Sequence, residues 1–470
     1  MASGVQPPGA VSADEALRGL WRQAGLPPEA LAFARLTGSA ADLPSSFAVG
    51  VAAQASIAAA ALAACELAHQ RGTGRQQVMV DSAHAATECT GWFSLDGLAP
   101  ELWDALSGLY RCADGFVRIH ANFAHHRDGA LRLLGLQPGQ AQRADVQAAL
   151  GRWRAKDFED AAAQAGLVAT ALRSFAEWDA TPQGRANAAQ PLFTIERLPG
   201  DAPPLRLPAL SAQDRPLAGV RVLDLTRILA GPVGGKALAA YGADVMLVNA
   251  PHLPNIAAIA DTSRGKLSTH IDLRSAEGRA ALRSLLADAH VWVQGYRPGG
   301  LQALGWGPHD VAALRPGIVQ VSLSAYGTQG PWAGRRGFDS LVQTAMGFNQ
   351  AEGEAAAGGA PQALPMQILD EATGYLIAFG AAAALRRQQR EGGQWHVQVS
   401  LAQTGQWLRS LGRLPQGLAA QAPDRTPWLE VADSGFGRLY ALRHSAQLGR
   451  TPAGWARPSM PPGTHPPRWP

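Results

Sequence analysis

The stretch "GVRVLDLTRILAGPVGGKALAAYGADVMLVN" (219–249) decides the fold class of this 470-residue chain. An apolar run (219–226) is followed by a turn, then by a helix that opens at a proline (232–242), and finally by a second apolar run (243–249). Proline is favoured in the first turn of a helix. Two short apolar runs joined by a helix are typical of parallel strands with a crossover between them. The stretch therefore predicts an α/β protein.

The same alternation continues after residue 249. Further strands are expected at 267–273, 291–296 and 317–327, with an amphipathic helix at 275–289. Strands that alternate with helices in this way predict a doubly wound, Rossmann-like parallel sheet.

A proline-rich segment, "LPGDAPPLRLPALSAQDRPLAG" (198–219), divides the chain. Before it lie an Ala-rich helix (47–68), a strand that enters a helix (75–86), and the material of a smaller α+β domain, including a strand within 114–123. We predict four regions. Residues 1–200 form a back-half-like region that includes the small domain, and residues 201–218 are a linker. Residues 219–402 form a nucleotide-binding half, and residues 403–470 are a Pro/Trp-rich tail.

Composition excludes several classes of protein. The net charge of +4 is small for 470 residues, and no Lys/Arg run marks a nucleic-acid surface. The longest apolar run (47–68) is rich in alanine, which contributes little to membrane insertion, so it predicts a buried helix and no membrane role. The N-terminus lacks the pattern of a signal peptide, and we expect a cytoplasmic protein.

Neither cysteine nor histidine indicates a metal site. Cys65, Cys89 and Cys112 are too few and too scattered for a disulfide framework or a thiolate site. Three histidines gather in "HANFAHH" (120–126), but no carboxylate completes a metal-binding spacing, and we interpret the segment as a surface loop. We therefore expect no bound metal.

An internal repeat singles out one acid. "RGTGRQQVMVDSA" (71–83) aligns with "REGGQWHVQVSLA" (390–402), 319 positions later, and both follow an Ala-rich helix. At this offset Val51 stands opposite Asp370 in "LPMQILDEATGYLIAFG" (364–380). Acids are favoured in the first turn of any helix. Because only one copy carries the acid, the asymmetry favours a chemical role for Asp370.

Several stretches in unbroken order resemble the family III CoA-transferases (the CaiB/BaiF group), which include formyl-CoA transferase and the carnitine CoA-transferases. The stretches are "PLAGVRVLDLTRILAGP" (216–232), "YGADVMLVNAP" (241–251), "SRGKLSTHIDLRSAEGR" (263–279), "YRPGGLQALGW" (296–306), "SLSAYGTQGPWAGRRGFDSLVQTAMG" (322–347) and "ILDEATGYLIAFGAAAALRRQQREGGQWHVQVSLA" (368–402).

The resemblance implies that coenzyme A passes from an acyl-CoA thioester to a carboxylic acid, with Asp370 as the nucleophile. Acyl-CoA is then a substrate, and no prosthetic group is required. Successive helix positions point about 100° apart, so only one of Asp370 and Glu371 can face the ligand, and we expect that to be Asp370. The family positions that contact CoA correspond here to Arg227, Ile228, Leu229, Ala230, Arg264, Lys266, Gly295, Tyr296 and Arg297.

The chain departs from the family pattern in several places. The family usually has a charged residue after the second strand, where this chain reads "LVNAP" (247–251), and a common arginine is replaced by Ala303. The small-domain material precedes the nucleotide-binding half, so the chain looks permuted or fused. We expect its two halves to complete one CoA site, and the resemblance implies a homodimer.

Two alternatives stay open. The same fold family includes acyl-CoA racemases, which use a histidine in a G-H-D pattern. Here that segment is "GFD" (337–339), and the phenyl ring of Phe338 cannot transfer a proton. The other alternative is a CoA-binding protein with reduced catalytic activity.

Overall fold

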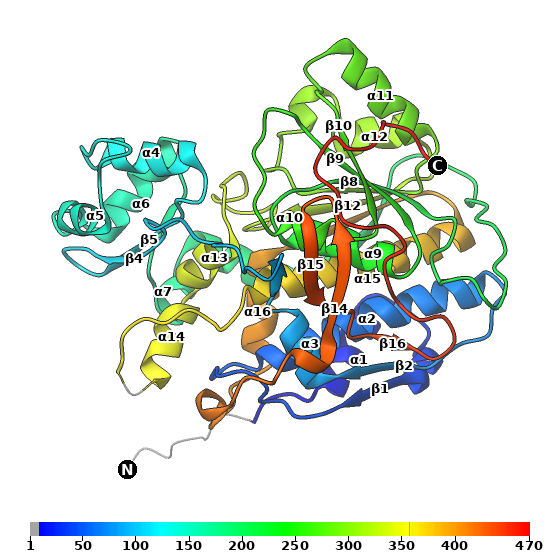
Figure 1. Cartoon of the computed structure of the whole chain (residues 1–470), viewed down its shortest axis with the longest axis horizontal. Helices are drawn as coiled ribbons and strands as arrows, with labels where there is room; N and C mark the ends of the chain where they lie inside the picture. Colours follow the sequence, from blue (N-terminus) through cyan, green and yellow to red (C-terminus); the bar gives the residue numbers. More distant parts are fainter. Residues whose placement is uncertain (1–8, 357) are drawn as a thin grey trace.

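The computed structural model describes residues 9–356 and 358–470, and its centre is a seven-stranded sheet (Figure 1). The strand order is β10-β9-β8-β11-β12-β13-β7, and every neighbouring pair is parallel except β13 with β7. The six parallel strands therefore follow the doubly wound order 3-2-1-4-5-6, which confirms the predicted fold class. The strands are β7 (Phe193–Leu198), β8 (Arg221–Leu225), β9 (Asp244–Asn249), β10 (Lys266–His270), β11 (Val291–Gln294), β12 (Val319–Ser324) and β13 (Gln394–Ser400).

Helices cover both faces of this sheet because successive side chains of a buried strand point to opposite sides. Val222 packs into the core shared with α9 (Ala230–Ala240) and α15 (Ile368–Glu391). Its neighbour Leu223 packs into a second core. That core contains residues of α11 (Ala276–Ala287) and α12 (Pro308–Leu314), and Figure 1 shows these two helices on the opposite side of the sheet from α9 and α15.

The predicted strand–turn–helix is present, with shifted boundaries. The strand predicted at 219–226 is β8, and the turn ends two residues earlier than expected, because α9 begins at Ala230. Pro232 consequently lies inside the first turn of α9, where a missing N–H leaves no hydrogen bond broken. The early start brings the N-terminus of α9 directly to the end of the sheet.

The two copies of the repeat pack against each other through their long helices. In the first copy α2 (Val49–Gln70) is followed by β2 (Val78–Asp81) and α3 (Ser82–Glu88). In the second copy α15 is followed by β13 and α16 (Leu401–Ser410). Gln70 and Gln389, which are 319 positions apart, hydrogen bond to each other (Nε2–Oε1, 3.4 Å). Both helices are long and apolar enough to cross a membrane, and both are buried inside the protein.

The predicted smaller α+β domain is a separate subdomain of residues 104–171, at the left of Figure 1. Its sheet contains β4 (Gly108–Arg111), β5 (Phe116–Ile119) and β6 (Ala169–Ala171). Three helices pack on it: α4 (Ala124–Leu133), α5 (Arg143–Leu150) and α6 (Ala155–Gln164). Residues such as Tyr110, Val117 and Phe158 give this small subdomain a core of its own.

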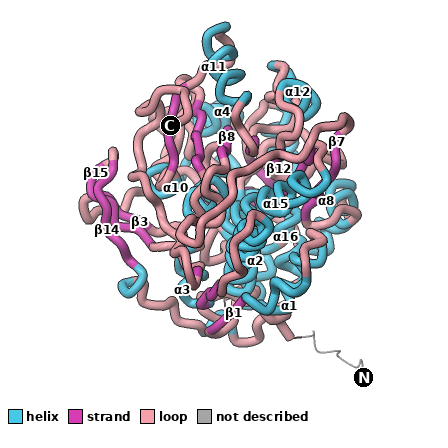
Figure 2. Tube along the Cα trace, turned by 90° about the vertical axis from the view of Figure 1, so that its right-hand side faces the viewer, coloured by secondary structure: helices cyan, strands magenta, loops and turns pink. Residues whose placement is uncertain are grey.

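The C-terminal region contains strands that the sequence pattern did not predict. β14 (Leu429–Ser434) and β15 (Gly437–Leu442) form a hairpin that adds to β3 (Phe93–Leu95), and Figure 2 shows it at the rim of the molecule. β16 (Gln447–Leu448) joins β2, whose other neighbour is β1 (Ala34–Thr37). The remaining α-helices are α1 (Ala13–Gln23), α7 (Phe175–Asp179), α8 (Pro182–Ala188), α10 (Ile259–Thr262), α13 (Asp339–Met346) and α14 (Phe348–Ala355).

Candidate active site

Asp370 lies in the first turn of α15 and lines a cavity of about 320 Å³, called here the Asp370 cavity. The loops that follow β8 and β11 line the same cavity. From β8 the chain order runs outward in both directions across the sheet, so the carboxyl ends of β8 and β11 mark the topological switch point, where doubly wound folds bind ligands. Glu371 does not line the cavity, as expected from the angle between successive helix positions.

The structure brings most of the predicted CoA-contacting residues to this cavity. They come from the turn between β8 and α9 and from the loop after β11. Those that line the cavity are Arg227, Ile228, Leu229, Ala230, Gly295, Tyr296 and Arg297. Residues far apart in sequence therefore converge on Asp370.

Lys266 and Arg264 lie elsewhere. The Lys266 ammonium is fully buried and donates to the Asp224 carboxylate (2.8 Å) and to the Pro232 carbonyl oxygen (2.8 Å). Arg264 pairs with Asp261 and Glu430. Because acidic partners already neutralise both charges, the geometry does not support either residue as a CoA contact, and those roles stay predictions.

Backbone strain marks the turn between β8 and α9. Ile228 has φ = 79°, a conformation that is rare for a β-branched residue. Such strain costs on the order of 1–3 kcal/mol and gathers at functional sites, where the surrounding structure enforces it. The turn sets the backbone of Ala230 beside Asp370, and a hydrogen bond from that backbone opposes the rise in the pKa of the carboxyl.

Glycines allow α9 and α15 to approach closely. A Cβ atom on Gly374 would lie only 2.7 Å from the Ala230 carbonyl oxygen, and one on Gly234 only 2.8 Å from the Ile377 side chain. Real Cβ atoms do not tolerate such distances, so both positions require glycine. This close packing holds Asp370 against the first turn of α9.

The Asp339 carboxyl lies beside Asp370 and accepts a hydrogen bond from its backbone. The Asp370 backbone N–H donates to Asp339 Oδ2 (2.8 Å), and the Gln343 side-chain amide donates to Asp339 Oδ1 (2.6 Å). Burial, followed by the charge of Asp339, raises the pKa of Asp370 well above its usual range. Burial also raises the pKa of Asp339 to about 7. The two carboxyls therefore disfavour each other's ionised form.

This coupling predicts how activity depends on pH. Only the ionised form of Asp370 can attack, so kcat/KM should rise as pH increases through the raised pKa. In Asp339→Asn the neighbouring charge is absent, and the acidic limb of the profile should move to lower pH. Stability should change in the opposite direction. The raised pKa of Asp339 makes the wild-type protein lose stability as pH rises from the ordinary aspartate range through about 7. The variant should escape this loss.

The measurements are a pH profile of kcat/KM from about pH 5 to about pH 9 and urea unfolding at both ends of that range. An acidic limb that stays in place or moves to higher pH would contradict electrostatic coupling between the two carboxyls. Ser340→Ala, which changes the next residue of α13 without changing any charge, is the matched control.

An aromatic wall, contributed by the small subdomain and the segment before α13, closes one side of the cavity. Phe338 stacks on His120 (ring centroids 4.1 Å apart) and on Phe123 (6.0 Å). His120 and His126 are both 5% exposed, so the interpretation of 120–126 as a surface loop is wrong for these two side chains. Packing against Phe338 buries them. No signal in the local sequence revealed this, although histidines interleaved with phenylalanine could have suggested a lined pocket.

Glu371 faces a different buried cluster, where charged neighbours include Lys236 and Glu88. Glu88 accepts hydrogen bonds from the hydroxyl of Tyr375 (2.9 Å) and the backbone N–H of Ser445 (2.7 Å), and His444 Nδ1 lies 2.9 Å from it. Although burial alone would raise it, the His444 interaction holds the pKa of Glu88 well below its usual range. This cluster fastens the C-terminal region to both copies of the repeat.

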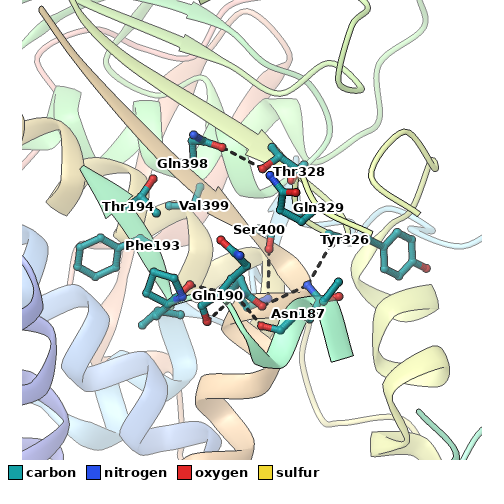
Figure 3. Close-up of a pocket in the computed structure, with 16 residues that line it drawn as sticks. Asn187, Gln190, Phe193, Thr194, Tyr326, Thr328, Gln329, Gln398, Val399 and Ser400 are labelled. Atoms are coloured by element: carbon teal, nitrogen blue, oxygen red, sulfur yellow. Dashed lines mark hydrogen bonds between the residues drawn. The ribbon is translucent and has the colours of Figure 1, made fainter. Parts of the chain in front are cut away.

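A second cavity, of about 40 Å³, lies where α8, β7, β12 and β13 meet (Figure 3). Gln403 lines this cavity, and its side-chain amide donates to the carbonyl oxygens of Asn187, Gln190 and Pro191. Its volume is enough for one or two water molecules. None of the predicted site residues lines it. The side-chain amides around it hydrogen bond to the chain itself, so we interpret it as a structural contact between these elements.

Several known proteins are similar to this chain in sequence. Residues 217–427 match the sequence model of CoA-transferase family III. An acetyl-coenzyme A transferase of Hypoxylon pulicicidum is 30% identical over 330 residues, which cover 65% of this chain and 55% of that protein. A succinate–glutarate CoA-transferase of Agrobacterium fabrum is 30% identical over 263 residues, covering 50% of this chain and 65% of that protein.

Among solved structures, a hypothetical protein of Mycobacterium tuberculosis is similar to this chain. It is 34% identical, with a TM-score of 0.39, over 43% of this chain and 58% of that one. The chain spans between about half and two thirds of the length of the curated relatives that it matches first.

Proposed function

We propose that this protein transfers coenzyme A from an acyl-CoA thioester to a carboxylic acid, with Asp370 as the nucleophile. One observation carries the proposal. A buried carboxylate and two predicted CoA-contacting loops line one cavity at the switch point of the sheet. The names of the relatives, which are CoA-transferases, support the same reaction.

Four exchanges at carbonyl carbon complete the reaction. The Asp370 carboxylate attacks the thioester carbonyl, the C–S bond breaks, and CoA leaves as thiolate while an acyl-aspartyl anhydride forms. The thiolate attacks the aspartyl carbonyl, which releases the donor acid as carboxylate and leaves an aspartyl-CoA thioester. The acceptor carboxylate attacks this thioester, the C–S bond breaks to expel the thiolate again, and a second anhydride forms between the acceptor and Asp370. The thiolate then attacks the acceptor carbonyl, which forms the new acyl-CoA and restores Asp370.

The cavity provides what these steps require. Arg227 and Arg297 present positive charge beside the N-terminus of α9, a combination that favours phosphate groups. Asp370 is almost fully buried, so water, which would hydrolyse the anhydride and the thioester, has little access to it. The strained turn at Ile228 holds backbone groups next to the developing charge.

A transfer screen tests the proposal. Acetyl-, butyryl- and succinyl-CoA are incubated with a panel of carboxylic acids, and new CoA thioesters are identified by mass spectrometry. We expect at least one donor–acceptor pair to exchange CoA without net hydrolysis. If CoA binds but no acid in the panel receives it, the alternative of a CoA-binding protein with reduced activity is favoured.

The residue at position 338 in the cavity wall argues against the racemase alternative. The ring of Phe338 packs against His120 and Phe123, and this residue itself carries no group that can transfer a proton. A homodimer and a cytoplasmic location stay predictions from the sequence.

A further inference from the structure

The side of the cavity formed by the small subdomain carries an unused polar group. His126, in the first turn of α4, lines the Asp370 cavity and is 5% exposed. Among residues 9–356 and 358–470, neither of its ring nitrogens has a hydrogen-bond partner. A buried polar group without a partner carries a free-energy penalty of about 1–3 kcal/mol. An imidazole kept in this state indicates a ligand that completes its hydrogen bonds.

The backbone at the start of α4 also offers hydrogen-bond donors to a ligand in this cavity. α4 is 10 residues long, and its N-cap residue, Phe123, gives no side-chain hydrogen bond to the first turn. Phe123, His125 and His126 all line the cavity, so the uncapped end of the helix opens onto it. Free N–H groups and the helix dipole favour an anion at this end.

A cation from another segment adds to this end of the cavity. Arg336 lines the cavity, and its charge acts directly on both His125 and His126. Its guanidinium donates to the Gly166 carbonyl oxygen (2.6 Å) and forms no ion pair within the described part of the chain. Neighbouring Arg335, in contrast, lies 3.6 Å from the Glu159 carboxylate. Arg336 therefore leaves a positive charge uncompensated beside His126.

We propose that His126, Arg336 and the N-terminus of α4 bind the second carboxylate of a dicarboxylic acid, while the first carboxylate exchanges CoA at Asp370. This inference rests on the proposed function and specifies its substrate class. A carboxylate accepts several hydrogen bonds at once and therefore suits an N–H imidazole, a guanidinium and free backbone N–H groups together. The relatives do not decide the class, because their names include both a succinate–glutarate and a fatty acyl-CoA transferase.

Two other roles for His126 fit less well. Burial lowers the pKa of His126 to about 3, so it is a poor base for removing a proton at neutral pH. The phosphates of CoA could also satisfy an anion site. Arg227 and Arg297, at the ends of the sheet strands, already provide cations for them, and we therefore assign the α4 end to the acid.

Kinetics with two matched acids test the inference. Glutarate and pentanoate have the same number of carbons and differ in the second carboxylate. We expect wild-type protein to prefer glutarate. In His126→Leu the KM for glutarate should rise about 10- to 100-fold, the range for a lost hydrogen bond to a charged group. The KM for pentanoate should change less than about threefold. His126→Asn, which keeps a side-chain N–H donor, should restore part of the preference.

Two kinetic outcomes would overturn the inference. If His126→Leu raises the KM for glutarate and the KM for pentanoate equally, the residue has a general structural role. If it raises the KM for every acyl-CoA donor whatever the acid, the anion at this end is a phosphate of CoA. Arg336→Gln should repeat the selective effect on glutarate, and its failure to do so would also count against the site.

Calorimetry separates this inference from the proposed function. Glutarate should bind to wild-type protein at least about tenfold more tightly than pentanoate, and His126→Leu should remove that difference. Selective binding without any CoA transfer would uphold the carboxylate site and reject the proposed reaction. CoA transfer without selective binding of glutarate would uphold the proposed reaction and reject the carboxylate site.

Discussion

Asp370→Asn should lower kcat for CoA transfer at least about 1,000-fold, because an amide cannot attack the thioester and no covalent intermediate can form. The fold should survive the change. Burial already disfavours the charged form of Asp370, so a neutral side chain of the same shape suits the site. Kinetic assays should be paired with mass spectrometry of the protein after incubation with an acyl-CoA, in which wild-type chains carry a CoA or acyl adduct and the variant carries none.

Glu371→Gln is the matched control for this variant. Glu371 is the adjacent acid on the same helix turn, is even less exposed to solvent than Asp370 (2% against 9%) and does not line the cavity. Its substitution should leave kcat within about threefold of wild type. If Asp370→Asn retained more than about a tenth of the activity, or the control lost as much as the variant, Asp370 would not be the nucleophile.

Lys266→Met should lower the free energy of unfolding by about 3–5 kcal/mol, because it leaves the Asp224 carboxylate buried without its partner. Both side chains are fully buried between β8, β10 and α9, so water cannot replace the lost interaction. Urea unfolding monitored by circular dichroism measures the loss. Lys266→Met/Asp224→Leu, which removes both charges, should recover most of the stability.

This experiment also decides the role of Lys266. The sequence predicted a CoA contact there, whereas the structure shows an internal ion pair. A variant that keeps its stability and loses affinity for CoA would restore the original prediction. Loss of stability in the single variant, followed by its recovery in the double variant, would identify a structural lysine.

The sequence could predict the parts of the site that depend on local pattern. The order of strand, turn and helix at 219–242 specifies where β8 ends, and parallel strands bring such ends to one edge of the sheet. The position of Asp370 at a helix start was equally visible. Its contrast with Val51 in the other copy needed only an alignment of the chain with itself.

The sequence could not predict what depends on packing between distant segments. Asp339 supports Asp370 across 31 positions, and His126 reaches the cavity only because the small subdomain docks beside the sheet. Arg264 and Lys266 carry charges that a sequence pattern places on the surface or on a ligand, yet both are turned inward to acidic partners. The β14–β15 hairpin needs β3, more than 300 positions earlier, as its neighbour.

The pairing of α2 with α15 has a consequence for stoichiometry. The two helices occupy matching places in the repeat, but only α15 carries an acid in its first turn, and Val51 stands at the corresponding place in α2. On the proposed mechanism each polypeptide can therefore hold no more than one acyl or CoA group at a time.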